Sequence, residues 1–243
     1  MPELPPGLLD ALGGAGRVVA LTGSGVSAES GVPTFREAQT GLWERFDPQE
    51  LATPEAFARD PWLVWSWYEW RRKLVERAEP NPGHLALAEL ERRLPDFALV
   101  TQNVDGLHQR AGSRNVTELH GNILRSKCSL EGAAVDDYAP DVAPPPCPNC
   151  GAPLRPDVVW FGEALPSEAF EAASGAARAC DLFLSVGTSS LVYPAAALPF
   201  EALENGAWLV EVNPNETPLT PHAHHLLRGP AGEVLPGLVE AIS

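Results

Sequence analysis

Three polar side chains that follow apolar runs are the strongest candidates for chemistry in this sequence. His120 stands in LHGN, and Asn103 and Asp105 stand in TQNVDG. A histidine titrates near neutrality, so it suits a general base that removes a proton from a hydroxyl group. A neighbouring amide and carboxylate can orient a polar ligand. The alternatives are a structural histidine and an Asx-rich turn that only caps a helix.

A glycine-rich turn at residues 23–28 (GSGVSA) follows an apolar run and fits the G-x-G-x-x-A pattern of dinucleotide-binding proteins. Glycines let the backbone approach a pyrophosphate, and the N-terminus of a following helix favours its negative charge. A turn without a ligand is the alternative. The segment after Gly31 is not a second strand that ends in an acidic residue. This disfavours an ordinary NAD(H) dehydrogenase and favours a loop that closes over the ligand.

Tyr68 and Arg71 are three residues apart in a predicted helix, so their side chains lie on the same face. A guanidinium fork and a phenol hydroxyl can together bind a carboxylate. A surface arginine beside a half-buried tyrosine is the alternative. A separate apolar stripe on this helix is expected in the core and comprises Leu63, Trp67, Trp70 and Leu74.

Three of the four cysteines, Cys128, Cys147 and Cys150, lie within one segment. Cys147 and Cys150 form a C-x-x-C knuckle, which is typical of one half of a structural zinc site. In a cytosolic chain we expect thiols or metal ligands rather than disulfides. Cys180 stands apart in an apolar stretch and is expected in the core.

The elements that must position these residues alternate between strands and helices. Continuous apolar runs begin near residues 17, 97, 182 and 207, with shorter versions in NVTELHGN and DVVWFGE. Such runs are typical of strands covered on both faces, as in a parallel sheet. The helices between them have start signals at Thr53-Pro54, Asp60-Pro61 and Asn81-Pro82. The predicted fold is therefore α/β and doubly wound, with ligands beyond the carboxyl ends of the strands.

Length and charge restrict the possible partners. The chain has 243 residues, enough for one sizeable core, and its 17 Lys and Arg against 32 Asp and Glu give a net charge of −15. This charge disfavours nucleic acid and anionic membranes. The beginning of the chain has no basic residue before Arg17, and the uncharged residues 182–200 contain a polar GTSS and two prolines. We therefore expect a soluble cytosolic protein.

Six motifs occur in the order in which they occur in sirtuins, the NAD-dependent protein lysine deacylases. They lie at residues 23–36, 101–108, 119–122, 158–163, 187–190 and 212–215. The chain thus resembles a single sirtuin catalytic domain. The resemblance implies a Rossmann-like large lobe, at about residues 1–40, 80–122 and 157–243, and an inserted helical and zinc-binding small lobe, at about 41–79 and 123–156. It also implies that NAD and an acyl-lysine side chain meet in the cleft between the lobes.

The same resemblance assigns individual residues. His120 matches the general base, Asn103 would assist it by holding ribose and ordered water, and Asp105 with the Val104 backbone would bind the nicotinamide carboxamide. An extended peptide would pair with a strand edge at Val159, Phe161, Gly162 and Glu163. The implied NAD-binding set is Gly23, Ser24, Gly25, Ser27, Ala28, Glu29, Pro33, Thr34, Phe35, Arg36, Trp43, Gln102, Asn103, Val104, Asp105, Gly187, Thr188, Ser189, Asn213, Pro214, Asn215 and Ala231.

Tyr68 and Arg71 resemble the Tyr-x-x-Arg of the sirtuin branch that removes succinyl and malonyl groups. The predicted activity is therefore deacetylation together with desuccinylation or demalonylation, with acyl transfer to ADP-ribose and release of nicotinamide. Mono-ADP-ribosyl transfer, NAD hydrolysis and a non-catalytic NAD sensor are the alternatives.

Two positions depart from the family pattern. Ser24 replaces the usual alanine, and we expect little effect. Glu131 stands where sirtuins commonly have cysteine. Three thiolates with Glu131, a water or another ligand would hold zinc, or the lobe binds no metal.

Overall fold

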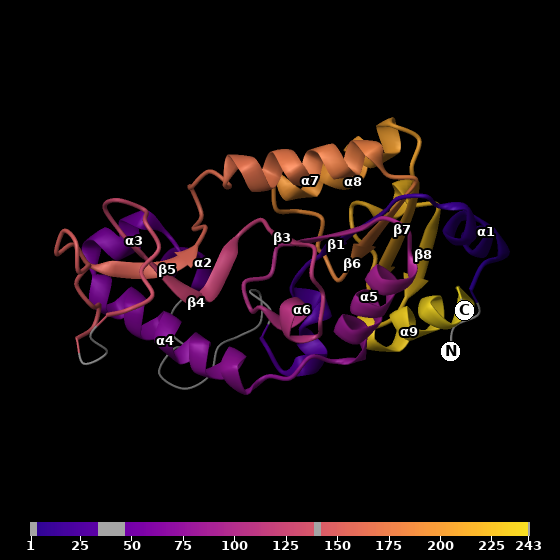
Figure 1. Cartoon of the computed structure of the whole chain (residues 1–243). Coiled ribbons are helices and arrows are strands. Elements are labelled where there is room, and N and C mark those ends of the chain that lie inside the picture. Colours follow the sequence, from indigo (N-terminus) through magenta and orange to yellow (C-terminus); the bar gives the residue numbers. More distant parts are fainter. Residues whose placement is uncertain (1–3, 34–46, 139–141, 243) are drawn as a thin grey trace.

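The computed structural model describes residues 4–33, 47–138 and 142–242. Within these ranges, six parallel strands form the main sheet in the order β3-β2-β1-β6-β7-β8 (Figure 1). This is the strand order of a Rossmann sheet, and it confirms the predicted doubly wound α/β class. The strands are β1 (Val18–Thr22), β2 (Phe97–Thr101), β3 (Val116–Glu118), β6 (Leu182–Val186), β7 (Trp208–Asn213) and β8 (His225–Arg228).

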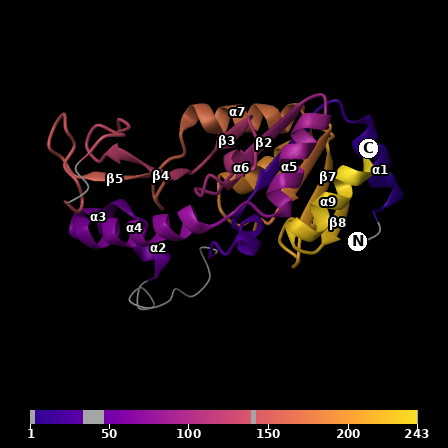
Figure 2. The ribbon, with the colours of Figure 1, turned by 60° about the horizontal axis from the view of Figure 1, so that its bottom comes forward.

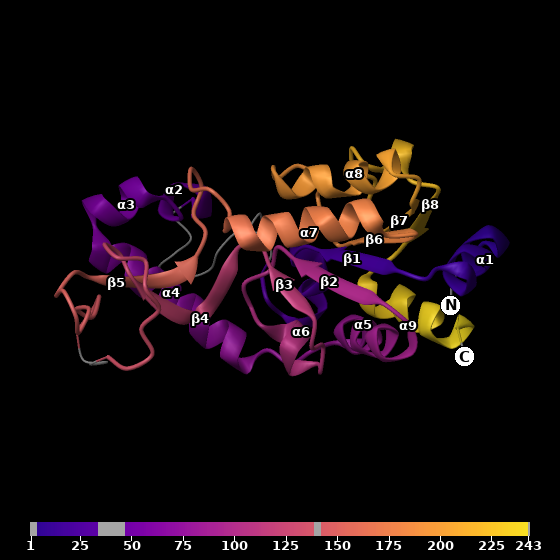
Figure 3. The same cartoon turned by 45° about the horizontal axis from the view of Figure 1, so that its top comes forward.

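Helices cover both faces of this sheet (Figures 1 and 3). Val18 and Ala20 of β1 pack in one apolar cluster, whereas Val19 and Leu21 pack in another on the opposite face. This alternation follows from the two-residue repeat of a strand, and it explains why residues 18–21 are all apolar. The first cluster includes α1 (Pro6–Gly14), α5 (Pro82–Arg93) and α9 (Ala231–Ala241), and the second includes α7 (Ser167–Ala179) and α8 (Leu198–Glu204).

The predicted helix starts are confirmed by their capping bonds. The side chains of Thr53, Asp60 and Asn81 each accept a backbone N–H from the first turn of the following helix. These bonds begin α3 (Pro54–Arg59), α4 (Pro61–Arg77) and α5, and each helix has proline at its first position. Local sequence therefore sets where α4, the helix with Tyr68 and Arg71, begins.

A second sheet lies beside α2 (Pro48–Leu51), α3 and α4, away from the main sheet (Figure 2). In the described residues it consists of β4 (Gly121–Cys128) and β5 (Leu154–Val158), which are antiparallel. Gly121 has φ +78°, and a Cβ atom there would lie 2.2 Å from the carbonyl oxygen of Asp157. Only glycine fits this crossing, which carries the chain from β3 and His120 directly into the small sheet.

The expected strand at residues 158–163 is wrong in two respects. The strand β5 ends at Val158 and pairs with β4 rather than joining the parallel sheet. Residues 159–163 form a turn, in which Glu163 Oε2 accepts the Trp160 N–H at 2.8 Å and Gly162 has φ +88°. This side chain-to-backbone bond competes with extended pairing, so an apolar pattern typical of a strand continues into a turn.

The helices at residues 48–77 and the small sheet share one apolar core. It includes Phe57, Trp67, Tyr68, Ile123 and Trp160. This packing supports the inserted lobe expected from the sequence, while the lobe boundaries themselves stay a prediction. Among the described residues, no helix combines the length and apolar character needed to cross a membrane.

Candidate functional site

The carboxyl ends of the parallel strands lie along one side of the main sheet, which we call the strand edge. The order of the strands reverses between β1 and β6, which creates the crevice where ligands bind in open α/β sheets. The segments that reach this edge are residues 23–30, 102–105, 119–120, 187–189 and 214–215, which follow β1, β2, β3, β6 and β7.

Two glycine turns touch backbone to backbone at the reversal point. Gly25 N–H donates to the Gly187 carbonyl at 2.9 Å, and a Cβ atom on Gly25 would lie 2.7 Å from that oxygen. Gly187 itself has φ +60°. The glycines therefore keep the turns after β1 and β6 in contact, and they leave their backbone groups close to the crevice.

The turn after β1 continues as two short 3-10 helices, η1 (Ser24–Val26) and η2 (Ala28–Ser30). The α-helix expected directly after the turn is therefore wrong. Glu29, a predicted cofactor residue, accepts the Gly232 N–H at 2.7 Å and so caps the first turn of α9, where the predicted residue Ala231 is buried. In this structure the Glu29 side chain ties the turn to the last helix.

Ser27 is the centre of a buried hydrogen-bond network. Its hydroxyl donates to Asp105 Oδ2 at 2.7 Å and accepts the Asn103 amide at 3.1 Å. The same amide donates to the Gly23 carbonyl at 3.1 Å. Asp105 also accepts the Leu107 N–H that begins α6 (Leu107–Arg110), and burial raises the pKa of its carboxyl. The network brings together four of the predicted residues, at positions 23, 27, 103 and 105.

A pair of buried histidines, His84 and His108, supports this network, and the sequence analysis gave no role to His84. The His84 ring lies 4.9 Å from the His108 ring, and its Nε2 lies 3.3 Å from the Ser27 hydroxyl. Burial lowers the pKa of His84 to about 4 and that of His108 to about 3, so both rings are neutral at physiological pH. Ser27 is 57 residues from His84 along the chain, and no local pattern signals their contact.

The geometry of His120 fixes the position of its proton. His120 Nδ1 lies 2.9 Å from the Gln102 carbonyl oxygen, which can only accept a hydrogen bond. The Nδ1 atom therefore carries the proton, and Nε2 keeps its lone pair. Burial lowers the pKa of His120, while the bond to Gln102 opposes this shift. The structure thus favours a neutral His120 ring with its proton on Nδ1 and a lone pair on Nε2.

The turns after β6 and β7 are also bonded to each other. The Thr188 hydroxyl lies 3.2 Å from that of Ser185 and 3.1 Å from that of Ser190, and the Asn213 amide donates to the Thr188 carbonyl at 2.7 Å. The Thr188 hydroxyl thus lies buried among its neighbours, and the role of Thr188 in binding the cofactor stays a prediction. The remaining predicted residues of these turns are more exposed and comprise Ser189, Pro214 and Asn215.

The structure shows few contacts for the other predicted cofactor residues. Ser24, Ala28 and Pro33 are exposed, and the Val104 carbonyl accepts the Ile123 N–H at 2.8 Å. Four further predicted residues lie outside the described residues, namely Thr34, Phe35, Arg36 and Trp43.

The edge geometry agrees with comparisons to known proteins. Residues 23–194 match the Sir2 family. The chain belongs to the Sir2 family. The NAD-dependent protein deacylase 1 of Pseudomonas aeruginosa is 54% identical over 241 residues, which cover 96% of each chain. The NAD-dependent protein deacylase of Thermus thermophilus is 56% identical over 226 residues, which cover 90% of this chain and 87% of that protein.

Solved structures of Sir2 proteins have the same fold as this chain. A Sir2 homolog–NAD complex superposes with a TM-score of 0.93 at 48% identity, covering 99% of this chain and 94% of that one. A Sir2–p53 peptide–NAD+ complex superposes with a TM-score of 0.88 at 33% identity, covering 98% of each chain. The resemblance to sirtuins stated from the motifs is confirmed.

In this Sir2 protein, two adjacent arginines of α4 have different surroundings. Arg72 is 6% exposed and donates to the Ile123 carbonyl at 2.6 Å and to the Arg125 carbonyl at 3.0 Å, so it joins α4 to β4. Arg71 is half-buried and lines a small apolar cavity with Pro33 and Trp70. Its guanidinium carbon lies 5.9 Å from the Tyr68 ring centroid. Tyr68 and Arg71 are thus side by side, as their spacing predicts.

The segment at residues 159–163 is bonded into the protein through most of its N–H groups. Val159 N–H donates to the His120 carbonyl at 2.9 Å, and Phe161 N–H donates to the Ala52 carbonyl at 2.9 Å. The Glu163 carboxylate binds Arg155 as well as the Trp160 N–H, so its side chain serves the turn itself. Among the described residues, the Gly162 N–H and the Val159 carbonyl make no backbone bond.

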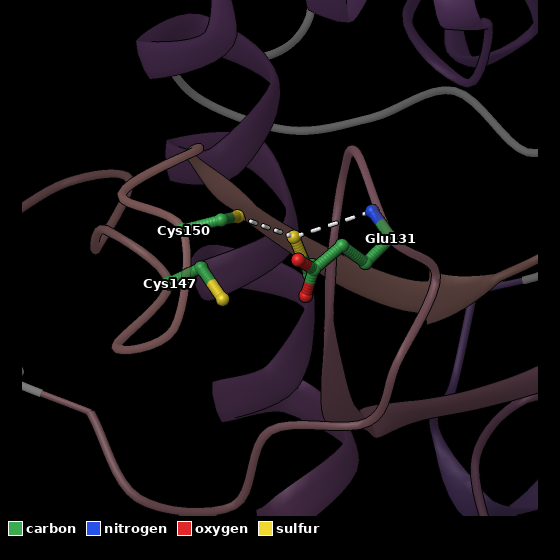
Figure 4. A group of neighbouring side chains, drawn as sticks. Glu131, Cys147 and Cys150 are labelled. Atoms are coloured by element: carbon green, nitrogen blue, oxygen red, sulfur yellow. Dashed lines mark hydrogen bonds between the residues drawn. The ribbon is translucent and has the colours of Figure 1, made fainter.

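Glu131 completes a cluster with the three cysteines predicted as metal ligands. The ligand atoms of Cys128, Glu131, Cys147 and Cys150 lie within 4.8 Å of one another. Figure 4 shows the Glu131 carboxylate directed toward the thiols of Cys147 and Cys150. Three thiolates and one carboxylate are all ligands that Zn²⁺ accepts, and four of them suit a closed structural site. These residues fit a zinc ion that would connect the loops at residues 128–131 and 147–150.

Proposed function

We propose that this protein removes acyl groups from protein lysines with NAD as co-substrate. The observation that carries the proposal is the neutral His120, whose Nε2 lone pair lies at the strand edge where the Sir2 family motifs converge. The relatives named NAD-dependent protein deacylase and the Sir2 complexes with NAD and with a peptide support it.

The NAD site fits the crevice at the strand reversal. The interlocked turns of Gly25 and Gly187 let backbone groups approach a pyrophosphate, and Ser189 and Asn215 stand beyond them. Bound NAD supplies an electrophilic anomeric carbon with nicotinamide as its leaving group. The buried Ser27 network holds the Asn103 amide and the Asp105 carboxylate at fixed positions beside this crevice, so their orientation costs nothing during the reaction.

His120 performs the proton transfer in this proposal. Its Nε2 takes the proton of a ribose hydroxyl, while the Nδ1–H bond to Gln102 keeps the ring in place and stabilises the imidazolium that forms. The Val159 N–H bond to the His120 carbonyl joins the base to the segment proposed to bind the substrate peptide. The peptide would use the Val159 carbonyl and the Gly162 N–H, which make no backbone bond among the described residues.

We further propose that Tyr68 and Arg71 bind a carboxylate at the end of the acyl chain, so that succinyl-lysine and malonyl-lysine are substrates as well as acetyl-lysine. Burial raises the pKa of Tyr68 to about 12, which keeps its hydroxyl protonated as a donor. Burial also lowers the pKa of Arg71, while the negative charge of Asp105 opposes this shift. We call Tyr68 and Arg71 together the carboxylate clamp. The effect of Asp105 on Arg71 shows that this clamp lies within electrostatic reach of the Ser27 hydrogen-bond network.

Mass spectrometry of a lysine peptide incubated with the protein and NAD tests the activity. We expect deacylated peptide, nicotinamide and O-acyl-ADP-ribose in equal amounts, and none of them without NAD. ADP-ribosylated protein or free ADP-ribose without deacylated peptide would contradict deacylation, and absence of turnover would favour a sensor.

Two variants test the acyl preference. Tyr68→Phe and Arg71→Met should each lower kcat/KM for a succinyl-lysine peptide by roughly 10- to 100-fold, because each removes a hydrogen bond to a charged group. Deacetylation should fall much less. Equal losses on the two peptides would contradict the clamp.

A further inference from the structure

The Tyr68 hydroxyl makes a hydrogen bond whose direction is fixed by its partner. The indole N–H of Trp160 lies 3.0 Å from the Tyr68 oxygen. An indole N–H only donates, so the Tyr68 oxygen is the acceptor. The hydroxyl proton of Tyr68 is then left for another acceptor. Among the described residues no second hydrogen bond of this hydroxyl occurs, although Tyr68 is only 3% exposed.

Trp160 is held in its orientation by an ion pair behind it. The Arg155 guanidinium carbon lies 3.3 Å from the Trp160 ring centroid, and both terminal nitrogens of Arg155 bind the Glu163 carboxylate, at 2.5 and 2.8 Å. The same carboxylate accepts the Trp160 backbone N–H. Phe57 packs on the ring with centroids 5.2 Å apart, and Trp160 is 2% exposed. The indole therefore cannot turn away from Tyr68 without breaking this arrangement.

A phenol that accepts one hydrogen bond becomes a better donor, because hydrogen bonds in a chain polarise one another. The Arg71 side chain stands three residues along the same helix, with its guanidinium carbon 5.9 Å from the Tyr68 ring centroid. A ligand that reaches the Tyr68 proton thus also meets a positive charge. A carboxylate satisfies both groups, whereas the methyl group of an acetyl chain satisfies neither.

We propose that Trp160 is a positioning residue for acyl selectivity: its indole N–H occupies the Tyr68 oxygen and so directs the Tyr68 proton to the carboxylate of a succinyl or malonyl chain. Glu163 and Arg155 act through Trp160 by holding its ring. This inference rests on the proposed carboxylate clamp and deepens it, since it gives selectivity to a residue that does not touch the acyl carboxylate.

The test compares Trp160→Phe with the parent on succinyl-lysine and acetyl-lysine versions of one peptide. Phenylalanine keeps an aromatic ring and removes only the N–H and part of the ring area. We expect kcat/KM for the succinyl peptide to fall roughly 5- to 10-fold, mainly through KM, and that for the acetyl peptide to fall by a clearly smaller factor. The ratio of the two values does not depend on the fraction of folded enzyme, so a loss of stability does not obscure it.

A double-mutant cycle separates positioning from packing. If Trp160 acts through Tyr68, Trp160→Phe should leave the succinyl-to-acetyl ratio unchanged when it is introduced into the Tyr68→Phe variant. Trp62→Phe is the matched control, because Trp62 lies on the same helix as Tyr68 and is 60% exposed. It should change neither activity.

The outcomes distinguish this inference from the proposed function. A parent that removes succinyl groups and is sensitive to Tyr68→Phe, but keeps its acyl ratio in Trp160→Phe, overturns the role of Trp160 alone. Equal losses of Trp160→Phe on both peptides also overturn it, since a purely structural role predicts them. A parent with no activity on succinyl-lysine overturns the carboxylate clamp and this inference together, while deacetylation would still support a deacylase.

Discussion

The strand edge of the main sheet and the small lobe hold their functional residues by different means. At the edge, short polar side chains bind one another and the backbone, as Ser27 does with Asn103 and Asp105. In the small lobe, large side chains on α4 pack against aromatic rings, as Tyr68 does against Trp160. The Arg72 bonds to β4 and the cysteine cluster then hold the lobe together.

This difference separates two tasks. The edge presents fixed polar groups for a cofactor that is the same in every reaction cycle, so its network is buried and bonded within itself. In our proposal the lobe distinguishes acyl groups with two neighbouring side chains of α4. Changes at the edge should therefore affect all substrates alike, whereas changes in the lobe should divide into losses of folding and losses of selectivity.

The largest expected effect comes from the metal cluster. Removal of zinc by a chelator, or Cys150→Ser, should unfold the loops around the cluster and abolish activity on every peptide, because structural zinc contributes directly to folding. Trp65 lies in one apolar cluster with Cys128, so a change in tryptophan fluorescence should accompany the loss of this structure. Metal analysis of protein purified without a histidine tag should give one zinc per chain.

The variant Glu131→Cys should increase the zinc affinity of this site. A fourth thiolate should bind zinc more tightly than the carboxylate, and a competition titration with a chromogenic chelator measures the difference. Metal-free protein with a folded small lobe, or unchanged affinity in Glu131→Cys, would contradict the zinc site.

The adjacent arginines of α4 give the next largest effect. Arg72→Met should lower the free energy of unfolding by about 3 kcal/mol, because several buried carbonyl and hydroxyl groups lose their donor. Arg71→Met should change stability much less and instead lower desuccinylation. Urea denaturation and kinetics on both peptides check the pair. Loss of stability in Arg71→Met with selectivity intact would reverse the two assignments.

A smaller effect is expected from Ser27→Ala. The loss of the hydroxyl removes one partner each from the Asp105 carboxylate and the Asn103 amide, which costs roughly 1–3 kcal/mol. Because this network lies at the cofactor edge, kcat/KM should fall by the same factor for acetyl and succinyl peptides. Calorimetric titration measures the affinity for NAD, and kinetics measure kcat/KM on both peptides. A loss on only one of the two peptides would contradict the division of tasks between the strand edge and the small lobe.

The pH dependence gives the smallest effect. Burial lowers the pKa of His120, so the neutral base is already present at a pH where an exposed histidine is still charged. The kcat/KM profile should therefore rise through a midpoint below the ordinary histidine value of about 6.5 and then level off. His84 and His108 are neutral well below this range and should not add a second transition. A midpoint above that value would contradict the tautomer and environment found here.

Local signals predicted the fold and the motifs well. The caps at Thr53, Asp60 and Asn81 and the apolar runs of β1 and β6 depend on residues close in sequence, so they can be read directly. The C-x-x-C spacing likewise predicted one half of the metal cluster.

Contacts between distant residues could not be read in the same way. Nothing in the sequence places His84 beside Ser27, or the Trp160 indole against the Tyr68 hydroxyl 92 residues away. The turn at residues 159–163 was mistaken for a strand because its apolar pattern is strand-like, whereas Glu163 bonds to the Trp160 N–H. The motifs thus predicted the candidate site, and the structure added the residues that contact and orient its side chains.

The central claim is that His120 transfers a proton during deacylation but is not needed for NAD binding. The variant His120→Ala tests this most directly. NAD binding measured by calorimetry should stay within a few-fold of the parent, while deacylation of both peptides falls by roughly 10²- to 10⁴-fold. His222→Ala, at an exposed histidine, should leave both quantities unchanged. Deacylation at the parental rate by His120→Ala would contradict the account.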